Sequence, residues 1–344
     1  MKITRLSCLV AWAFPLLVSA ATEHALRIAV WDTGVAVQEE YFAPHRVTNA
    51  GELVDGRAVP NGIDDDRNGF IDDLHGLVLD DDRSREVSDP TFPHGSQVAS
   101  VAVAGLPWLG LVPIRQGSIL RPGQEPGKTL FRPVTTADRA AASDKALLVA
   151  AFLRAWRVRL VNISFGSAWE DKLRESLDPS EDGRRLAAEH YALERQYYAG
   201  IIDASPGVLF VVAAGNDRKD LAAFPCLPQV LERPNLLVVG GLAYVPSLRQ
   251  GIVLSNFGPS VNLWAPYLGI PCWDPVSRKP VTRVGTSFSA PLVARMAAQL
   301  WHALPGLRAE EVARALLDSR PFSRSEKEAD LEKALELARR DAGS

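Results

Sequence analysis

Val208-Leu-Phe-Val-Val-Ala-Ala214 is the most apolar strand-length run in the chain, and Gly215-Asn216 ends it. A continuous apolar run bounded by turn residues predicts a strand that is buried on both faces. Other strand candidates lie at 25–31, 110–115, 159–164, 235–240 and 261–264. Between and after them, apolar residues recur at helical spacing over 143–156, 184–198 and 287–302. Strands that alternate with helices predict an α/β fold of three layers, with a mostly parallel twisted sheet and helices on both faces.

The composition is that of a soluble globular protein. Among the 344 residues, 47% are hydrophobic and 23% are charged, and the formal net charge is −3. This charge gives no reason to expect nucleic acid or an anionic membrane as a partner. Because there is no internal repeat or low-complexity linker, we expect a single domain over 21–344. Its last part, from about 320 to 344, is highly charged and is expected to be a solvated helical extension. Ser143 and Asp144 are expected to cap the start of the helix predicted at 143–156.

The first twenty residues have the layout of a secretory signal peptide. Lys2 and Arg5 precede a short apolar stretch, and Val18-Ser19-Ala20 offers small residues where a signal peptidase cleaves. We therefore expect an exported protein, periplasmic or secreted, with no membrane contact beyond the signal. An uncleaved anchor or a buried first helix is the alternative. In an exported protein the remaining pair, Cys226 and Cys272, suggests one disulfide; two free buried thiols are the alternative.

Four polar residues stand at the ends of predicted elements. Asp32 ends the first strand, His94 begins an apolar helical run, Asn216 ends the most apolar strand, and Ser287 opens the last large helix. Taken singly, each has an ordinary structural explanation as a turn former, a structural His or a helix cap. Ligands, however, bind beyond the carboxyl ends of parallel strands, and a helix start stabilises developing negative charge. Gly95 would let another backbone approach His94 closely.

Together these segments resemble the subtilisin-like serine peptidases, whose catalytic residues come in the order Asp, His, Ser. The matching segments are 30–34, 94–98, 162–166, 213–216 and 285–291, and the resemblance extends over about residues 25–318. It implies a catalytic triad of Asp32, His94 and Ser287 that cleaves polypeptides through an acyl-enzyme, with no cofactor for the chemistry. The Asn216 side chain and the Ser287 backbone N–H would bind the oxyanion.

The resemblance also locates the substrate. Ser164-Phe165-Gly166 is expected to form an edge on which an extended peptide pairs as an added strand, and such pairing predicts broad specificity. Ala214, Gly215 and Asp217 complete the expected substrate-binding residues. Asp217 would lie near the pocket for the residue before the scissile bond, and a preference for basic side chains there is a hypothesis.

A second site is predicted in the acidic segment 61–73. Asp64, Asp66 and Asn68, followed by Gly69, match the early positions of a Ca²⁺-binding loop. His75 stands where such a loop carries a bidentate Glu, so Asp72 or Asp73 would supply the missing oxygens. Clustered carboxylates repel one another without a cation. The alternative is an acidic surface loop.

Three features differ from the family pattern. Secreted members carry an inhibitory propeptide, whereas only a few residues separate Ala20 from the first strand here, so we expect unaided folding or a separate regulator. His94 is followed by Gly-Ser rather than Gly-Thr, and 121–138 has no counterpart and is expected to be a surface loop.

A catalytically inactive binding module is the competing function. An α/β-hydrolase esterase would need a Gly-x-Ser-x-Gly elbow, which the chain lacks.

Overall fold

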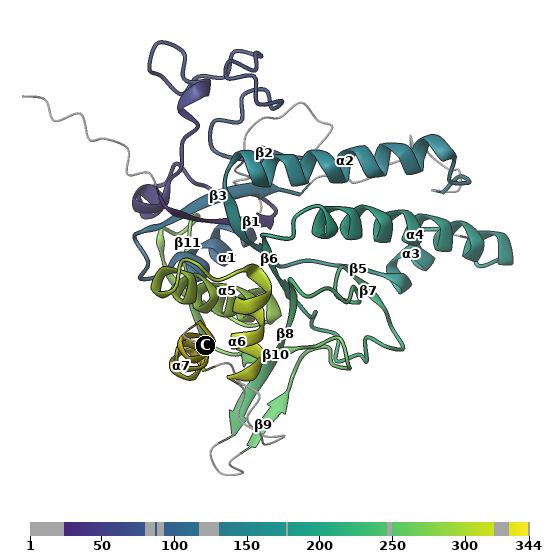
Figure 1. Cartoon of the computed structure of the whole chain (residues 1–344). Coiled ribbons are helices and arrows are strands. Elements are labelled where there is room, and N and C mark those ends of the chain that lie inside the picture. Colours follow the sequence, from purple (N-terminus) through teal and green to yellow (C-terminus); the bar gives the residue numbers. More distant parts are fainter. Residues whose placement is uncertain are drawn as a thin grey trace, which may run out of the picture.

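The computed structural model describes residues 24–79, 87, 93–116, 131–176, 178–245, 250–319 and 330–342. Its centre is an eight-stranded sheet in the order β10-β8-β6-β4-β1-β3-β2, with β9 paired to β8 (Figure 1). Every pair in this path is parallel, and only β9 runs antiparallel. The strands are β1 (Leu26–Asp32), β2 (Leu77–Val78), β3 (Leu109–Arg115), β4 (Val158–Ile163), β6 (Leu209–Ala213), β8 (Leu236–Val245), β9 (Gln250–Val253) and β10 (Leu263–Pro266).

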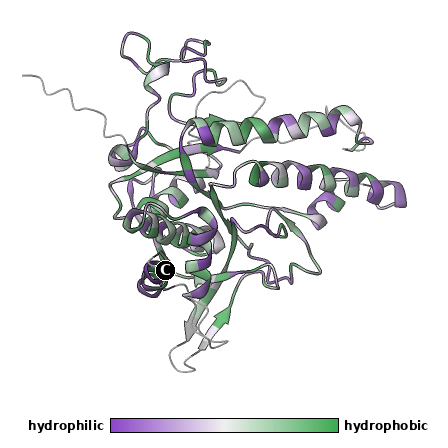
Figure 2. Cartoon of the chain, in the orientation of Figure 1, coloured by the Kyte–Doolittle hydropathy of each residue, from purple (hydrophilic) through white to green (hydrophobic). Residues whose placement is uncertain are grey.

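Helices cover both faces of this sheet. They are α1 (His94–Val103), α2 (Thr136–Ala155), α3 (Trp169–Glu175), α4 (Glu181–Asp203), α5 (Thr286–Ala303), α6 (Ala309–Asp318) and α7 (Leu331–Ala342). In Figure 1, α2 and α4 lie together on one side of the sheet, and α5, α6 and α7 lie on the other. Figure 2 shows that these helices carry mixed hydrophobic and hydrophilic residues, whereas the central strands are mostly hydrophobic.

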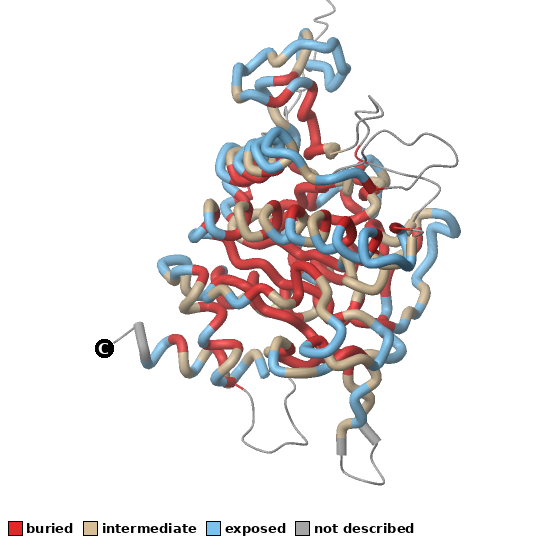
Figure 3. Tube along the Cα trace, turned by 90° about the vertical axis from the view of Figure 1, so that its right-hand side faces the viewer, coloured by how far each residue is buried: buried red, intermediate tan, exposed pale blue. Residues whose placement is uncertain are grey.

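The side-chain alternation of β1 divides the core in two. Ile28 and Val30 belong to the apolar cluster that includes α1, α5 and α6. Ala29 and Trp31 belong to the cluster formed with α2 and α4. Because successive side chains of a strand point to opposite faces, one strand supports both cores. Figure 3 shows the buried chain concentrated in the sheet between the two helical layers. The predicted three-layer α/β fold is therefore confirmed.

The start of α2 differs from its prediction. The helix begins at Thr136, and its cap is Thr135, whose side chain accepts a hydrogen bond from the Asp138 backbone while the Asp138 carboxylate accepts one from the Thr135 backbone. Ser143 and Asp144 lie inside the helix and do not cap it. A capping box satisfies two orphan donors at once and so fixes the helix start there. The predicted surface loop 121–138 therefore ends in helix, and 121–130 lies outside the described residues, as does the signal peptide 1–20.

The charged C-terminal segment forms α7, but this helix is not solvated on all sides. Ala334 and Ala338 are buried in the core cluster that contains α5 and α6. Their four-residue spacing puts both small side chains on one face of the helix, which allows close packing. Among the described residues, no helix combines the length and apolarity that crossing a bilayer would need.

The suggested disulfide is not formed, and both cysteines are free. Cys226 lies in β7 (Cys226–Leu227), which pairs with β5 (Ser167–Ala168). Cys272 lies in β11 (Ile270–Asp274), which pairs with β12 (Lys279–Arg283) and packs on α1. The two thiols therefore belong to separate small sheets. Burial raises the pKa of both, that of Cys226 to about 12, so each is a neutral thiol at physiological pH.

Candidate active site

Asp32 and His94 form a hydrogen-bonded pair at the carboxyl edge of the sheet. Asp32 is the last residue of β1 and is 2% exposed, and His94 is the first residue of α1. The His94 Nδ1–H donates to Asp32 Oδ1 over 2.7 Å, and the Thr33 backbone N–H donates to the same oxygen. A carboxylate pulled out of water this far needs such partners. The pairing fixes the imidazole tautomer and leaves Nε2 as the basic nitrogen.

Gly95 makes this approach of α1 to β1 sterically feasible. A Cβ atom at this position would lie 2.2 Å from the Gly34 carbonyl oxygen and 3.1 Å from the Asp32 Cβ. The first distance is far inside van der Waals contact and involves backbone, so no side chain fits there. The Gly95 N–H also donates to Thr33 Oγ1. The sequence-based expectation of a close backbone approach at Gly95 agrees with this geometry.

The pKa of His94 is shifted by opposing effects. Burial lowers it, while the hydrogen bond to Asp32 and the Asp32 charge raise it, and the net pKa lies above the ordinary value of 6.5. The imidazolium is thus stabilised relative to a histidine in water. A base with this property can hold a proton in an intermediate and release it later.

Ser287 stands in the first turn of α5, and the residue after it, Phe288, contacts His94. The rings of His94 and Phe288 meet edge to face with centroids 5.7 Å apart. The Ser287 hydroxyl donates to the Ser164 carbonyl over 3.3 Å, and among the described residues it makes no hydrogen bond to His94. Catalytic contacts are often loose before substrate binds and tighten in the complex. Forming a Ser–His pair would require the Ser287 hydroxyl to leave the Ser164 carbonyl.

Ser164 and Asn162 hold the backbone of this serine. The Ser164 hydroxyl donates to the Ser287 carbonyl over 2.9 Å and accepts from Asn162 Nδ2 over 2.9 Å. Asn162 is fully buried in β4, so it anchors the chain from inside the sheet. These two side chains bind the end of β4 to the start of α5 and restrict movement between them.

The Asn216 side chain is oriented so that its amide nitrogen can donate a hydrogen bond. Its Oδ1 accepts hydrogen bonds from the Thr286 backbone N–H over 2.9 Å and from the Thr286 hydroxyl over 3.1 Å. With its oxygen engaged, the amide of this exposed residue directs its N–H₂ group away from Thr286. The Asn216 amide and the N-terminus of α5 together can stabilise a developing negative oxygen.

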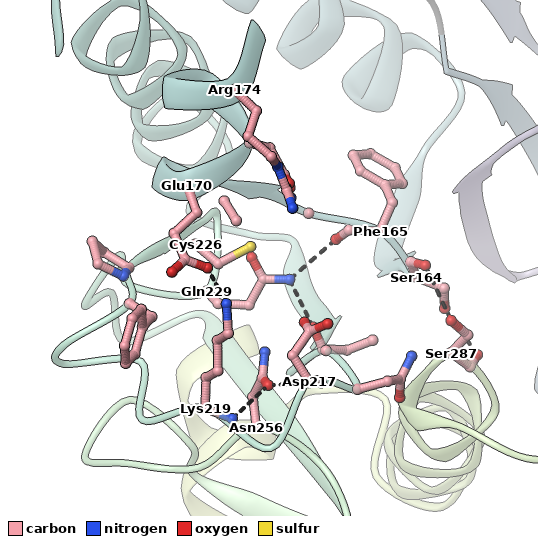
Figure 4. Close-up of a pocket in the computed structure, with 18 residues that line it drawn as sticks. Ser164, Phe165, Glu170, Arg174, Asp217, Lys219, Cys226, Gln229, Asn256 and Ser287 are labelled. Carbon is pink, nitrogen blue, oxygen red and sulfur yellow. Dashed lines mark hydrogen bonds and ion pairs between the residues drawn. The ribbon is translucent and has the colours of Figure 1, made fainter. Parts of the chain in front are cut away.

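A cavity of about 250 Å³ opens beside Ser287. Most of its lining comes from three stretches of chain, namely the segment after β4 with α3, the segment after β6 and the segment around β7, and Asn256 and Ser287 complete it (Figure 4). The sequence-predicted residues Ser164, Phe165, Gly166, Gly215, Asn216 and Asp217 all line it. Ala214 does not, because it is fully buried in an apolar cluster behind the wall.

Sequence reasoning missed the far wall of this cavity. Glu170, Lys219, Cys226, Gln229 and Asn256 line it as well. Asn256 holds the segment after β6, since its Oδ1 accepts from the backbones of Asp217 and Lys219 and its Nδ2 donates to the Ala214 carbonyl. No local motif marks these residues, because they come together only through the packing of separate loops.

The acidic segment forms a compact loop. Ligand atoms of Asp64 and Asp66 lie within 4.8 Å of one another and of Glu52, a residue that the sequence prediction did not include. Glu52 belongs to the short 3-10 helix η2 (Ala50–Glu52) and is 2% exposed. The pKa of Glu52 is raised, mainly by burial. Hydrogen bonds from the Asp66 and Asp65 backbones lower this pKa, and the charges of Asp66 and Asp73 raise it.

The other predicted ligands point elsewhere. The Asp72 carboxylate accepts from the backbones of Asn61 and Gly62, and the Asp73 carboxylate accepts from the Trp156 indole and from side-chain amides. The Asn68 amide donates to Asp66 and Asp73. These three groups fold the loop. Glu52, Asp64 and Asp66 also accept backbone hydrogen bonds, but among the described residues they are the carboxylates whose oxygens cluster within 4.8 Å, and such an all-oxygen set would fit a hard cation.

Comparisons with known proteins give one consistent result. The model of the subtilase family matches residues 23–336. Among curated proteins, no sequence matches the chain significantly.

Solved structures of subtilisin-like proteins share the fold. The structure described as the basis of subtilase cytotoxin SubAB assembly matches with a TM-score of 0.59 and 18% identity, over 93% of this chain and 91% of that one. A lanthipeptide protease matches with a TM-score of 0.58 and 18% identity, over 91% and 88%. A cold-adapted subtilisin-like serine proteinase matches with a TM-score of 0.51 and 21% identity, over 90% and 85%.

These structural similarities establish the fold, and the family match covers nearly the whole chain and includes every element around Asp32, His94 and Ser287. The chain belongs to the subtilase family, and this membership supports a serine peptidase.

Proposed function

We propose that this protein is an exported serine endopeptidase that hydrolyses peptide bonds through Asp32, His94 and Ser287. The observation that carries the proposal is the buried Asp32–His94 hydrogen bond, formed beside the helix start that holds Ser287. A purely structural histidine does not need a buried carboxylate on one nitrogen and a serine at a helix N-terminus near the ring.

The reaction begins when the Ser287 hydroxyl turns from the Ser164 carbonyl toward His94 Nε2. His94 accepts the hydroxyl proton as the oxygen attacks the substrate carbonyl, and Asp32 stabilises the imidazolium. The oxyanion accepts hydrogen bonds from Asn216 Nδ2 and from the Ser287 backbone N–H. Collapse expels the amine, which takes the proton from His94 and leaves an acyl group on Ser287. A water molecule, deprotonated by His94, then releases the acid product.

The competing function is a catalytically inactive binding module of the same fold. The joint presence of a paired Asp32–His94, an oriented Asn216 and an open cavity beside Ser287 favours the enzyme. A binding module would have no need to keep all of these groups together.

Replacing Ser287 with Ala tests the two functions. We expect the Ser287→Ala change to lower kcat on casein or a peptide substrate by about a millionfold, as loss of the nucleophile does in subtilisin. A fluorophosphonate should label the unchanged protein at Ser287 and leave the variant unlabelled. Ser260, in the turn before β10, provides a matched control, because its hydroxyl makes no hydrogen bond among the described residues and Ser260→Ala should alter neither result. Equal inactivity of wild type and Ser287→Ala, or an adduct on another residue, would favour the binding module.

The pH dependence follows from the sign of the His94 shift. The base works only when neutral, so kcat/KM should fall as the pH decreases through a pKa above 6.5. Substituting Asp32→Asn removes the carboxylate that raises this pKa, so activity should drop and the midpoint should move to lower pH. The measurement is kcat/KM against pH from about 4 to 9. An unchanged rate at the acidic end would contradict a histidine base.

Export is the part of the proposal that rests on residues 1–20. The basic n-region, the apolar stretch and the small residues at 18–20 support cleavage after Ala20. Expression with the native N-terminus should yield a mature protein that begins at Ala21 and is recovered outside the cytoplasm. Mass spectrometry of the intact protein measures this. A cytoplasmic product that retains Met1 would contradict export.

We also propose that Ca²⁺ binds at Glu52, Asp64 and Asp66 as a structural ion. A cation there would offset the mutual repulsion of these carboxylates. At a concentration about 100-fold above its Kd, such an ion should raise the melting temperature by about 5 °C. Chelation should reverse this, and Asp64→Asn should remove the difference, whereas the exposed control Asp144→Asn should not. Identical melting curves with Ca²⁺ and with chelator would dismiss the ion.

A further inference from the structure

Two sets of polar contacts hold α1, the helix that begins with His94. On one side, its first three residues make hydrogen bonds with the end of β1 and the turn that follows. On the other side, Gln97 and Ser100 bond to the hairpin of β11 and β12, which lies beside α1 (Figure 1). Because β12 leads through Gly285 into α5, this second set connects the helix of the base to the segment that carries Ser287.

The Gln97 side chain spans the hairpin. It is 4% exposed, its Nε2 donates to Asp274 Oδ1 over 2.7 Å, and its Oε1 accepts from Arg283 Nε over 3.0 Å. Asp274 ends β11 and Arg283 ends β12, so one amide contacts both strands. A carboxylate only accepts and a guanidinium only donates, which leaves the amide a single orientation. A carboxylate, an ammonium or an alkyl chain in place of this amide would leave at least one of the two groups without its partner.

Asp274 and the hairpin are themselves held in place. The buried Asp274 carboxylate accepts through Oδ2 from the Ser277 hydroxyl over 2.6 Å and from the Ser277 backbone N–H over 2.9 Å. The bond from the Ser277 hydroxyl is the main cause that lowers the pKa of Asp274, so this group is ionised at neutral pH. Ser100, on the turn of α1 after Gln97, accepts from the Trp273 backbone N–H over 2.8 Å. The hairpin therefore has a defined position against α1.

These directional contacts matter because the direct contact between α1 and α5 is apolar. Both helices contribute small and branched apolar residues to one core cluster, among them Ala99 and Ala290. Within the described part of the chain, no hydrogen bond joins the two helices, and the rings of His94 and Phe288 meet edge to face. Apolar contact is non-directional, so it does not fix one helix along the axis of the other. The distance from the base to the nucleophile therefore depends on polar contacts elsewhere.

We infer, on the basis of the peptidase function proposed above, that Gln97 is a positioning residue for the reaction. Its amide holds the helix of His94 at a fixed place against the hairpin that leads to Ser287, and so sets how closely the base approaches the nucleophile. Gln97 contacts neither reacting group, and its contribution to the rate is made through α1 and β12. A displacement of about 1 Å can cost about 100-fold in rate, so a small slip between these elements is enough to slow the reaction.

Replacing Gln97 with Met tests this role. The change keeps the length of the side chain and removes both hydrogen bonds. We expect kcat on a peptide substrate and the rate of fluorophosphonate labelling at Ser287 to fall by about 10- to 100-fold, with KM nearly unchanged. The pH midpoint of kcat/KM should stay where it is in wild type, because the hydrogen bond between Asp32 and His94 is left intact.

Gln196→Met is the matched control. The Gln196 amide also joins two helices, since its Nε2 donates from α4 to the Arg139 carbonyl over 2.9 Å and to the Ser143 hydroxyl over 2.8 Å in α2. Its loss should lower the melting temperature and change neither kcat nor labelling. Melting temperatures of all variants, measured in the same buffer, separate a loss of stability from a loss of rate.

Exchanging donor and acceptor provides a rescue. Gln97→Glu brings a carboxylate against Asp274, and Asp274→Asn brings one N–H₂ group against another, because Ser277 retains the asparagine oxygen. We expect each single change to lower kcat by about tenfold or more. In the double variant, the glutamate accepts from both the asparagine and Arg283, so kcat should recover to within about threefold of wild type.

The outcomes separate this inference from the proposed function. If Gln97→Met lowers the melting temperature as Gln196→Met does but leaves kcat and labelling unchanged, Gln97 is only structural, and the inference is wrong while the peptidase stands. A pH midpoint that moves in Gln97→Met also contradicts it, because the change would then act on the basicity of His94. A double variant as slow as the single ones overturns the inference equally, and this arm decides if Gln97→Met does not fold. Wild type that neither cleaves nor is labelled overturns the proposed function, and the inference with it.

Discussion

The hydrogen bond between Asp32 and His94 is the interaction on which the rest of the site depends. It joins the carboxyl end of β1 to the first residue of α1, and it gives a partner to Oδ1 of a carboxylate that the fold has removed from water, while Oδ2 accepts no hydrogen bond among the described residues. An uncompensated buried charge costs several kcal/mol, so the two residues constrain each other. The same bond sets the imidazole tautomer and leaves Nε2 as the basic nitrogen of a ring that contacts Phe288 at the start of α5. One contact thus serves both the packing of the sheet edge and the proposed chemistry.

The geometry around this bond is held by backbone proximity and by side chains that contact no substrate. Gly95 permits α1 to approach the turn after β1 within a distance that a methyl group would block. On the other side, Asn162 and Ser164 tie β4 to the backbone of Ser287. Thr286 fixes the orientation of the Asn216 amide. Precision in such a site comes from these supporting contacts, because a small displacement of a reacting group costs much of the rate.

The cavity beside Ser287 is formed mainly by loops, whereas Asp32, His94 and Ser287 stand at the ends of a strand and two helices. Its walls come from α3, the segment after β6 and the small sheet of β5 and β7, and its charged groups pair across these elements. Loops on a rigid sheet can change such pairs without disturbing the strand ends, which is how one fold supports different specificities. Asp217 lies on one of these loops, whereas Asp32 lies on a central strand.

The sequence by itself determined the sheet and the ends of its strands. Continuous apolar runs bounded by turn residues have few alternatives to buried parallel strands, and the segments around Asp32, His94, Asn216 and Ser287 resemble a family whose model then matched 23–336. Local patterns were less reliable where several polar residues could cap the same helix. The sequence pattern favoured Ser143 as the cap of α2, whereas the structure has the cap at Thr135. What only the tertiary structure decided depends on contacts between distant segments: the free thiols of Cys226 and Cys272, the approach of Glu52 to Asp64, and the meeting of Lys219 with Glu170. Such contacts depend on how loops pack on the finished sheet, and the spacing of residues along the chain carries no information about that packing.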